Sequence, residues 1–248
     1  MIVILLSCQL CIEEEACRVP MGTYHIVSPN KKPDKVWVFF HGWSGNPNQY
    51  IGKSYIDDVL SEKNIMLVLP KGKGDTWSME NMGGENSYRD EESFMLEIFD
   101  DIYRTRGGEE LPIYVGGFSL GGALSEQMAC TGSLNIAGVH PISGGFWDPV
   151  PESCASGFHI RHVHGLNDPT WPFEGRRVGS GTQAHQEDIQ VLWKRNSSCQ
   201  DEIIETTEGP LSCIEFTGCT NFVSWCTHLE GHTRLSGWFS RMVTSMEL

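Results

Sequence analysis

Residues 113–124 constrain the fold of this chain more than any other segment. An apolar run at 113–115 leads into Gly117-Phe118-Ser119-Leu120-Gly121, and an apolar stripe at helical spacing follows. A serine with glycines two residues before and two residues after it is typical of a sharp turn from a strand into a helix, because side chains at those glycines would collide with their neighbours. Such a turn holds the hydroxyl clear of the sheet, beside the free N–H groups of the helix N-terminus. The segment therefore predicts an accessible Ser119 on a strand-to-helix turn.

The rest of the sequence alternates between the same two kinds of segment. Short apolar or β-branched runs, typical of buried strands, occur at 24–27, 36–40, 65–69, 113–115, 136–139 and 160–163. Apolar residues at helical spacing occur at 95–103, 120–128, 189–193 and 238–246. The alternation predicts an α/β domain with a mostly parallel central sheet and helices on both faces. Because the sequence contains no repeat, low-complexity tract or linker, we expect a single domain over residues 17–248.

The composition limits the partners of such a domain. Its 18 Lys and Arg against 32 Asp and Glu leave a net charge of −14, which repels the phosphates of nucleic acids and anionic lipid surfaces. We therefore expect no nucleic-acid partner. No stretch approaches the roughly 20 apolar residues that span a bilayer, so we expect no transmembrane segment. The sequence leaves the oligomeric state open.

The nine cysteines predict disulfides in an oxidising compartment. Cys8 and Cys11 form a lone C-x-x-C without a second such pair, which argues against a structural zinc site. We expect a bridge between Cys199 and Cys219, which would tie the helix at 189–193 to the edge of the sheet. Cys213 and Cys226 are expected to pair across neighbouring strands. The alternative is a cytosolic protein with buried thiols.

The N-terminal residues indicate where the protein resides. The apolar run at 1–6 precedes Ser7 and Cys8, which resembles the end of a bacterial lipoprotein signal, although the basic segment of a full signal is missing. We interpret residues 1–16 as a signal remnant or an N-terminal extension. The expected location is secreted or periplasmic, with Cys8 as a candidate for lipidation.

A nucleophilic serine needs a base and a carboxylate that orients the base, and both follow Ser119 in the order Ser, Asp, His. Asp168 lies in a loop at the carboxyl end of an expected strand, where ligand sites form in parallel sheets. Asp148, in a turn that leaves the preceding strand, is the competing carboxylate. His232 follows the last expected strand beside a glycine and is the predicted base. His228, inside that strand, is the competing base.

The same chemistry needs N–H donors directed at an oxyanion. The N–H of Leu120, directly after the serine, is one expected donor. The other lies in the turn that follows the strand at 36–40, where we favour the N–H of Trp43 and keep Gly42 as the alternative.

Three further tryptophans occur in loops where a substrate would pass, namely Trp77, Trp147 and Trp171. Aromatic faces pack against acyl chains, aromatic acids or sugar rings, so these residues are predicted to bind substrate. The alternative is that they pack in the core, since large aromatic residues are mostly buried.

Several segments together resemble one known family. They are Cys17-Arg18-Val19-Pro20-Met21-Gly22-Thr23-Tyr24, Phe39-Phe40-His41-Gly42-Trp43, Gly117-Phe118-Ser119-Leu120-Gly121-Gly122, Ser143-Gly144-Gly145-Phe146-Trp147, His164-Gly165-Leu166-Asn167-Asp168 with Pro172, and Gly231-His232. From Cys11 onward the chain resembles a bacterial polyhydroxybutyrate depolymerase or a feruloyl-esterase-like α/β-hydrolase.

The resemblance implies a disulfide-stapled α/β-hydrolase fold. It also implies that Ser119, Asp168 and His232 form a catalytic triad, that Trp43 and Leu120 are the oxyanion donors, and that no metal or cofactor is needed. The chain departs from the family pattern at Trp171, before Pro172, and in the residues after His232, which leaves the substrate open.

We therefore expect a secreted or periplasmic serine carboxylic-ester hydrolase that forms an acyl-enzyme with a small or oligomeric ester. Two alternatives remain at this point. One is a non-catalytic extracellular binding protein on a hydrolase scaffold, because a fold does not establish a function. The other is a serine peptidase.

Overall fold

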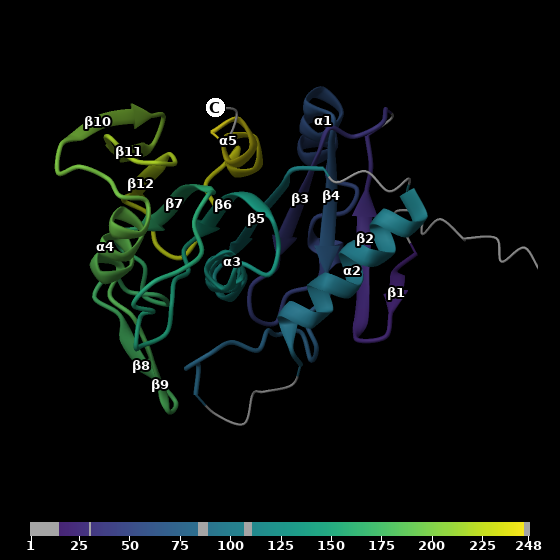
Figure 1. The fold of residues 1–248 in the computed structure, drawn as a ribbon, viewed down its shortest axis with the longest axis horizontal. Helices are drawn as coiled ribbons and strands as arrows, with labels where there is room; N and C mark the ends of the chain where they lie inside the picture. The colour runs from purple at the N-terminus through teal and green to yellow at the C-terminus, as the bar shows by residue number, and fades with distance from the viewer. Residues whose placement is uncertain (1–14, 30, 84–88, 107–110, 246–248) are drawn as a thin grey trace, which may run out of the picture.

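A ten-stranded sheet organises the chain in a computed structural model that describes residues 15–29, 31–83, 89–106 and 111–245 (Figure 1). Across the sheet the strands are β1 (Cys17–Val19), β2 (Gly22–Val27), β4 (Ile65–Pro70), β3 (Lys35–Phe40), β5 (Ile113–Phe118), β6 (Ile136–Ile142), β7 (His159–Gly165), β12 (Val223–His228), β11 (Leu211–Phe216) and β10 (Ile203–Glu208). The strands from β4 to β12 in this order are parallel to one another. Antiparallel strands complete both edges. The predicted mostly parallel sheet is thus confirmed, while the predicted strand at 24–27 lies in antiparallel β2.

Helices cover both faces of this sheet, as predicted. The helices are α1 (Ser54–Lys63), α2 (Glu91–Arg106), α3 (Leu120–Thr131), α4 (Gln186–Asn196) and α5 (Trp238–Thr244), with a short 3-10 helix at Pro47–Gln49. In Figure 1, α2 crosses in front of the strands near the N-terminal edge, and the hairpin of β8 (Arg176–Val178) and β9 (Gly181–Gln183) projects away from the sheet.

Strand β3 shows why its sequence is an unbroken apolar run. Val36, Val38 and Phe40 belong to the core that includes residues of α2, α3 and α4. Trp37 and Phe39, which alternate with them, belong to the second core, formed with α1 and α5. Because successive side chains of a strand point to opposite faces, a strand covered on both sides needs apolar residues at every position.

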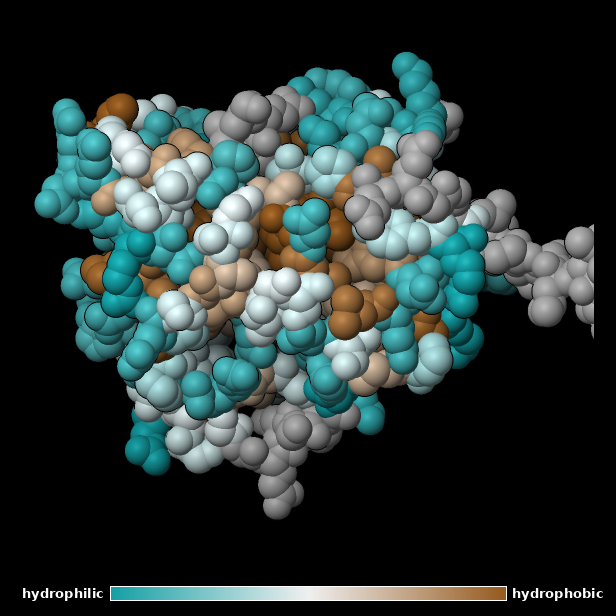
Figure 2. Space-filling model, in the orientation of Figure 1, coloured by the Kyte–Doolittle hydropathy of each residue, from teal (hydrophilic) through white to brown (hydrophobic). Residues whose placement is uncertain are grey.

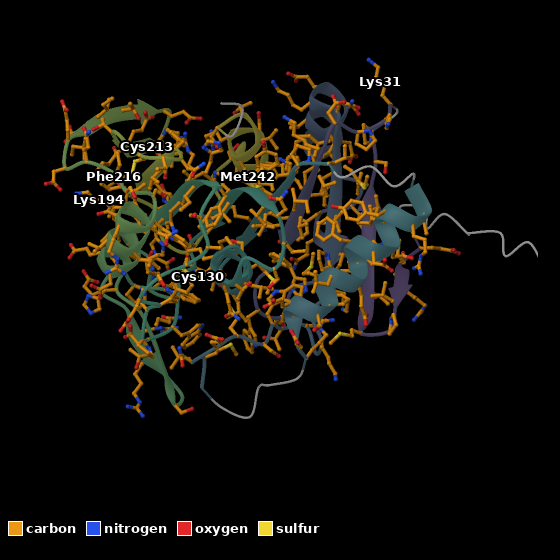
Figure 3. All side chains as sticks on the ribbon, viewed as in Figure 1. Lys31, Cys130, Lys194, Cys213, Phe216 and Met242 are labelled. Atoms are coloured by element: carbon orange, nitrogen blue, oxygen red, sulfur yellow. A yellow bond between two sulfur atoms is a disulfide. The ribbon has the colours of Figure 1, made fainter. Side chains whose placement is uncertain are left out.

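Between pairs of described residues, three disulfides join helices, loops and strands on the C-terminal half of the sheet. The predicted bridges are both present: Cys199–Cys219 joins the end of α4 to the segment after β11, and Cys213–Cys226 links facing residues of β11 and β12. A third bridge, Cys130–Cys154, ties the last turn of α3 to the segment before β7. Figure 3 labels Cys130 and Cys213 of these bridges. It also labels Lys194 of α4 and Phe216 of β11, where Nζ of the lysine lies 5.8 Å from the centre of the phenylalanine ring. These disulfides fit an extracellular protein.

The lipidation candidate Cys8 and most of the 1–16 extension lie outside the described residues, so the boundary at residue 17 stays a prediction. Among the described helices, none is long and apolar enough to cross a membrane. In the view of Figure 2, hydrophilic residues lie around the rim of the molecule and apolar residues gather mainly near the centre.

Candidate active site

Ser119 occupies the single position between the end of β5 and the start of α3. Its backbone has φ 58° and ψ −122°, a conformation that an L-residue adopts at a cost of about 1–3 kcal/mol. The N–H of Ser119 donates to the carbonyl oxygen of Ile142 at 2.8 Å, which ties the turn to the end of β6. Strain of this kind persists where the surrounding structure holds it, and it concentrates at functional sites.

The two glycines that flank this turn are required by close packing. A Cβ on Gly121 would lie 2.1 Å from the carbonyl oxygen of Phe40, at the end of β3. A Cβ on Gly117 would lie 2.1 Å from the carbonyl oxygen of Gly121 itself. The first turn of α3 can therefore approach β3 and β5 only without side chains at these positions. The spacing of the glycines follows from this contact.

Asp168 lies in the loop after β7 and is buried, with 4% of its surface exposed. The N–H groups of Thr170 and Trp171 both donate to its Oδ1 at 2.8 Å. Its Oδ2 accepts a hydrogen bond from Nδ1 of His232 at 2.7 Å. Burial favours a raised pKa of Asp168, but the hydrogen bonds from His232 and from the two backbone groups outweigh it and lower the pKa below its usual value. Asp168 is therefore a carboxylate at neutral pH.

His232 lies between this carboxylate and the serine turn. Its ring packs against Phe118, the residue before Ser119, with the ring centroids 4.8 Å apart. Since Nδ1 donates its proton to Asp168, a neutral imidazole carries its lone pair on Nε2. The arrangement leaves Nε2 as the basic atom of His232.

The two competing residues are not part of this hydrogen-bonded pair. Asp148 is exposed, and its N–H donates to the carbonyl oxygen of Thr182. His228 is buried within β12, and neither of its ring nitrogens has a hydrogen-bond partner among the described residues. The structure thus joins Asp168 to His232 by a hydrogen bond, and among the described residues it joins neither of them to Asp148 or His228 in this way.

The turn after β3 lies directly against the serine. A Cβ on Gly42 would lie 3.4 Å from the Cβ of Ser119. The side chain of His41 holds this turn, because its Nδ1 donates to the carbonyl oxygen of Gly42 at 2.8 Å and its Nε2 accepts from the N–H of Gly72 at 3.0 Å. Burial lowers the pKa of His41, which keeps the ring neutral as this pattern of one donor and one acceptor requires. The predicted donors, the N–H groups of Trp43 and Leu120, belong to the two turns that meet here.

The predicted substrate-binding tryptophans lie deeper than expected. Trp77 has no exposed surface, and its Nε1 donates to the carbonyl oxygen of His41 at 2.7 Å, so it packs beneath the His41 turn. Trp147 and Trp171 pack edge to face and are 6% and 2% exposed. Trp147 lines a pocket of about 190 Å³, and the substrate role of Trp147 and Trp171 stays a prediction. The indole of Trp43, by contrast, is 75% exposed.

Sequence reasoning missed several polar residues of this region. The segment at His41 predicts only a turn, and the segment that begins with His164 predicts only the loop of Asp168. Neither His162 nor Glu126 lies in any of the motifs. A signal was present in β7, where two histidines two residues apart interrupt a buried strand and must face the same side. Within the described part of the chain, no group of three His, Cys, Asp or Glu side chains is arranged to hold a metal ion.

Several proteins that are similar to this chain in sequence are named as feruloyl esterases or probable feruloyl esterases. Probable feruloyl esterase C of Aspergillus terreus is 24% identical over 214 residues, which are 82% of this chain and 72% of that protein. Probable feruloyl esterase C of Aspergillus clavatus is 27% identical over 207 residues, 79% of this chain and 68% of that protein. Feruloyl esterase C of Emericella nidulans is 24% identical over 212 residues, 81% of this chain and 71% of that protein. No family model matches the chain.

Solved structures of esterases share the fold of this chain. Acetyl xylan esterase from Aspergillus awamori superposes with a TM-score of 0.64 at 15% identity and covers 88% of this chain and 93% of its own. A carboxylesterase from Mesorhizobium loti superposes with a TM-score of 0.63 at 12% identity, over 93% of this chain and 98% of its own. The resemblance to feruloyl esterases is thereby confirmed, and the comparisons support a carboxylic-ester hydrolase. The chain is similar in sequence to feruloyl esterases and has an α/β-hydrolase fold.

Proposed function

We propose that the protein is a serine carboxylic-ester hydrolase in which Ser119 is the nucleophile, His232 the base and Asp168 the carboxylate that orients the base. One observation carries the proposal. The imidazole of His232 donates to the buried Asp168 at 2.7 Å and packs on Phe118, directly beside the strained Ser119. The names of the relatives and structural neighbours support the same class of reaction.

In the proposed reaction, Oγ of Ser119 attacks the ester carbonyl while Nε2 of His232 takes the hydroxyl proton. The carbonyl oxygen becomes an oxyanion, which the N–H groups of Leu120 and Trp43 bind; each such donor is worth about 3–4 kcal/mol in the transition state. His232 then returns its proton to the departing alcohol, and the acyl group stays on Ser119. Water repeats the sequence with the same groups and releases the carboxylic acid.

The electrostatics of Asp168 suit this role. When His232 becomes an imidazolium, the ionised carboxylate at its Nδ1 stabilises the new positive charge. Because the pKa of Asp168 is lowered, the carboxylate keeps its charge over the whole range in which an imidazole titrates. Because the carboxylate of Asp168 is buried, water does not compete with His232 for its Oδ2 atom, and the hydrogen bond between the two side chains stays short.

We propose esters of hydroxycinnamic acids as the substrate class, since the relatives found by sequence are feruloyl esterases. Exposed apolar side chains near the site support this choice. They are Trp43, Leu166 and Leu229, which are 75%, 47% and 76% exposed. Leu166 and Leu229 lie on the two loops that carry Asp168 and His232, and the side chain of Asn167 joins these loops by donating to the carbonyl oxygen of Leu229 at 2.6 Å.

A labelling experiment tests the proposal directly. A fluorophosphonate probe should modify the folded wild-type protein and leave Ser119→Ala unmodified. Hydrolysis of methyl ferulate, p-nitrophenyl acetate and a matching anilide then separates an esterase from a peptidase. A folded wild type that neither reacts with the probe nor cleaves any ester would favour the alternative of a binding protein on a hydrolase scaffold.

A further inference from the structure

A buried chain of hydrogen bonds runs behind the carboxylate of Asp168. His162 and His164 of β7 lie 3.3 Å apart through Nε2 and Nδ1. Nδ1 of His162 lies 3.2 Å from Oε1 of Glu126, which projects from α3. The indole N–H of Trp193, from α4, donates to the same Oε1 at 2.9 Å. Glu126, His162 and His164 have no exposed surface, so water does not complete their hydrogen bonds from the outside.

The direction of each hydrogen bond follows from one carbonyl group. Nε2 of His164 lies 2.8 Å from the carbonyl oxygen of Trp171, which can only accept, so Nε2 carries the proton. Nδ1 of a neutral His164 is then an acceptor, and Nε2 of His162 must be its donor. Nδ1 of His162 is consequently also an acceptor. Its partner Glu126 must therefore supply a proton, which requires a neutral carboxylic acid.

An ion pair between Glu126 and a doubly protonated His162 fits the surroundings less well. Oε2 of Glu126 has no hydrogen-bond partner among the described residues, and a buried carboxylate with one unsolvated oxygen is costly. The titratable groups that face Glu126 are His162 and His164 from β7, while α4 presents the indole of Trp193. Burial raises the pKa of Glu126 to about 8 and lowers the pKa values of His162 and His164 to about 3. All three are then neutral at pH 7.

At its other end, this series of hydrogen bonds reaches the loop that carries Asp168. The peptide of Trp171 is fixed on both sides, because its carbonyl oxygen accepts from His164 and its N–H donates to Oδ1 of Asp168 at 2.8 Å. We propose that Glu126, bound as a neutral carboxylic acid, is a positioning residue for Asp168 and acts through His162 and His164. The inference rests on the proposed function, in which Asp168 orients the catalytic histidine.

Loss of the proton from Glu126 would exchange donor and acceptor in each of these hydrogen bonds. His162 would then place its proton on Nδ1, toward the new carboxylate, and leave Nε2 bare. His164 would move its own proton to Nδ1 to supply that bond, and its bare Nε2 would face the carbonyl oxygen of Trp171. Two acceptors would meet where one hydrogen bond had been, which loosens the peptide that positions Asp168.

Two substitutions of Glu126 distinguish its hydrogen-bonding role from the space that its side chain fills. In Glu126→Gln the amide has no proton to lose, and it can donate to His162 and accept from Trp193, because no partner holds Oε2 in place. We expect kcat within about threefold of wild type near pH 7, with KM unchanged. Glu126→Leu removes the donor, and kcat should fall about tenfold or more with little change in KM. His140→Gln is the matched control, since His140 is equally buried on β6 and, in the described part of the chain, forms no hydrogen bond with these residues.

The pH profile distinguishes this role from a merely structural one. In the wild type, kcat should decline as pH rises through about 8, when Glu126 ionises in the folded protein. Glu126→Gln should keep its plateau across the same range. A Glu126→Gln variant that loses as much activity as Glu126→Leu, or a Glu126→Leu variant as active as wild type, would overturn the proposal.

Thermal unfolding tests the proton on Glu126 without any substrate. The folded protein holds this proton between pH 4.5, the ordinary value, and about 8, whereas the unfolded chain has released it. Wild-type stability therefore falls across this window relative to Glu126→Gln, and the gap in Tm between the two should widen until about pH 8 and then stay constant. A constant gap from about pH 5 to 9 would contradict a neutral Glu126. If the wild type fails to react with fluorophosphonate, the proposed function fails, but this comparison still decides the state of Glu126.

Discussion

Nδ1 of His232 lies 2.7 Å from Oδ2 of Asp168, although 64 positions separate the two residues in the sequence. The order of the strands produces this contact. β7 and β12 are parallel neighbours in which His164 pairs with Thr227 and Gly165 with His228, so the chain leaves both strands at the same edge of the sheet. The N–H of Leu166 also donates to the carbonyl oxygen of His228 at 2.8 Å, which joins the two loops at their start.

The proposed triad should behave as a unit when its members are replaced. Ser119→Ala, His232→Ala and the double variant should all lose roughly 10⁴-fold or more in kcat and reach about the same residual rate, because each change disables the same step. Asp168→Asn should lose a similar or smaller factor by misorienting the imidazole of His232. Steady-state kinetics on an activated ester measure these rates.

Matched replacements of the competing residues are the controls. His228→Ala and Asp148→Asn should keep kcat within about tenfold of wild type, provided that thermal melting shows an intact fold. If His228→Ala abolished turnover and His232→Ala retained it, the base would be wrongly assigned, although the esterase proposal would survive.

The lowered pKa of Asp168 predicts an acid-dependent loss of stability. The folded protein keeps the carboxylate ionised at pH values below 3.8, where the unfolded chain takes up a proton. This contribution is fully present above the unfolded value and is lost as pH falls through the lower folded value. Urea unfolding of wild type and Asp168→Asn should give a constant difference in stability between about pH 7 and 5, which then shrinks below about pH 4. A difference that grew toward acid would show that the pKa of Asp168 is raised instead.

Gly121 should tolerate no side chain. The Cβ of alanine would lie 2.1 Å from the backbone oxygen of Phe40, which cannot rotate away as a flexible side chain does. Gly121→Ala should therefore destabilise the protein by about 3 kcal/mol and shift the first turn of α3. Gly231→Ala is the control for stability, because its Cβ would come no closer than 3.3 Å to any atom outside its chain neighbours. Equal melting temperatures for the two variants would mean that the close approach at Gly121 relaxes without cost.

The parts of the fold that follow from local chemistry were predictable from the sequence. The run at 113–115 followed by Gly117-Phe118-Ser119-Leu120-Gly121 predicts β5, the turn and α3, because only glycines fit the contact between them. Two disulfides were predictable because Cys199 follows an expected helix while Cys219 follows an expected strand, and because Cys213 and Cys226 fall on neighbouring strands. The Cys130–Cys154 bridge was not, since it depends on where the segment before β7 returns to α3.

Burial in three dimensions explains what the sequence could not decide. A tryptophan in a loop has the same letter whether it faces solvent or the core, and only the packing against His41 shows that Trp77 lies beneath the site. The partnership of Glu126 with His162 likewise depends on the packing of α3 against the sheet and on Trp193 from α4, which lies 67 residues away in the sequence. Such groups are polar residues in apolar segments, and their partners come from tertiary structure.

The exposed indole of Trp43 should contribute to the choice of substrate. Trp43 follows Gly42, whose turn lies against Ser119, and 75% of its surface is open to solvent, which leaves room for an aromatic group beside the nucleophile. An aromatic pair adds about 0.5–1.5 kcal/mol, so Trp43→Ala should lower kcat/KM for methyl ferulate roughly 3- to 10-fold. The same variant should leave p-nitrophenyl acetate within about twofold, because an acetyl group is too small to reach the ring and the backbone N–H at residue 43 is retained. Val191→Ala on α4, another exposed apolar residue, is the control and should change neither substrate. An equal loss on both esters would mean that Trp43 shapes the turn itself rather than the contact with the acyl group.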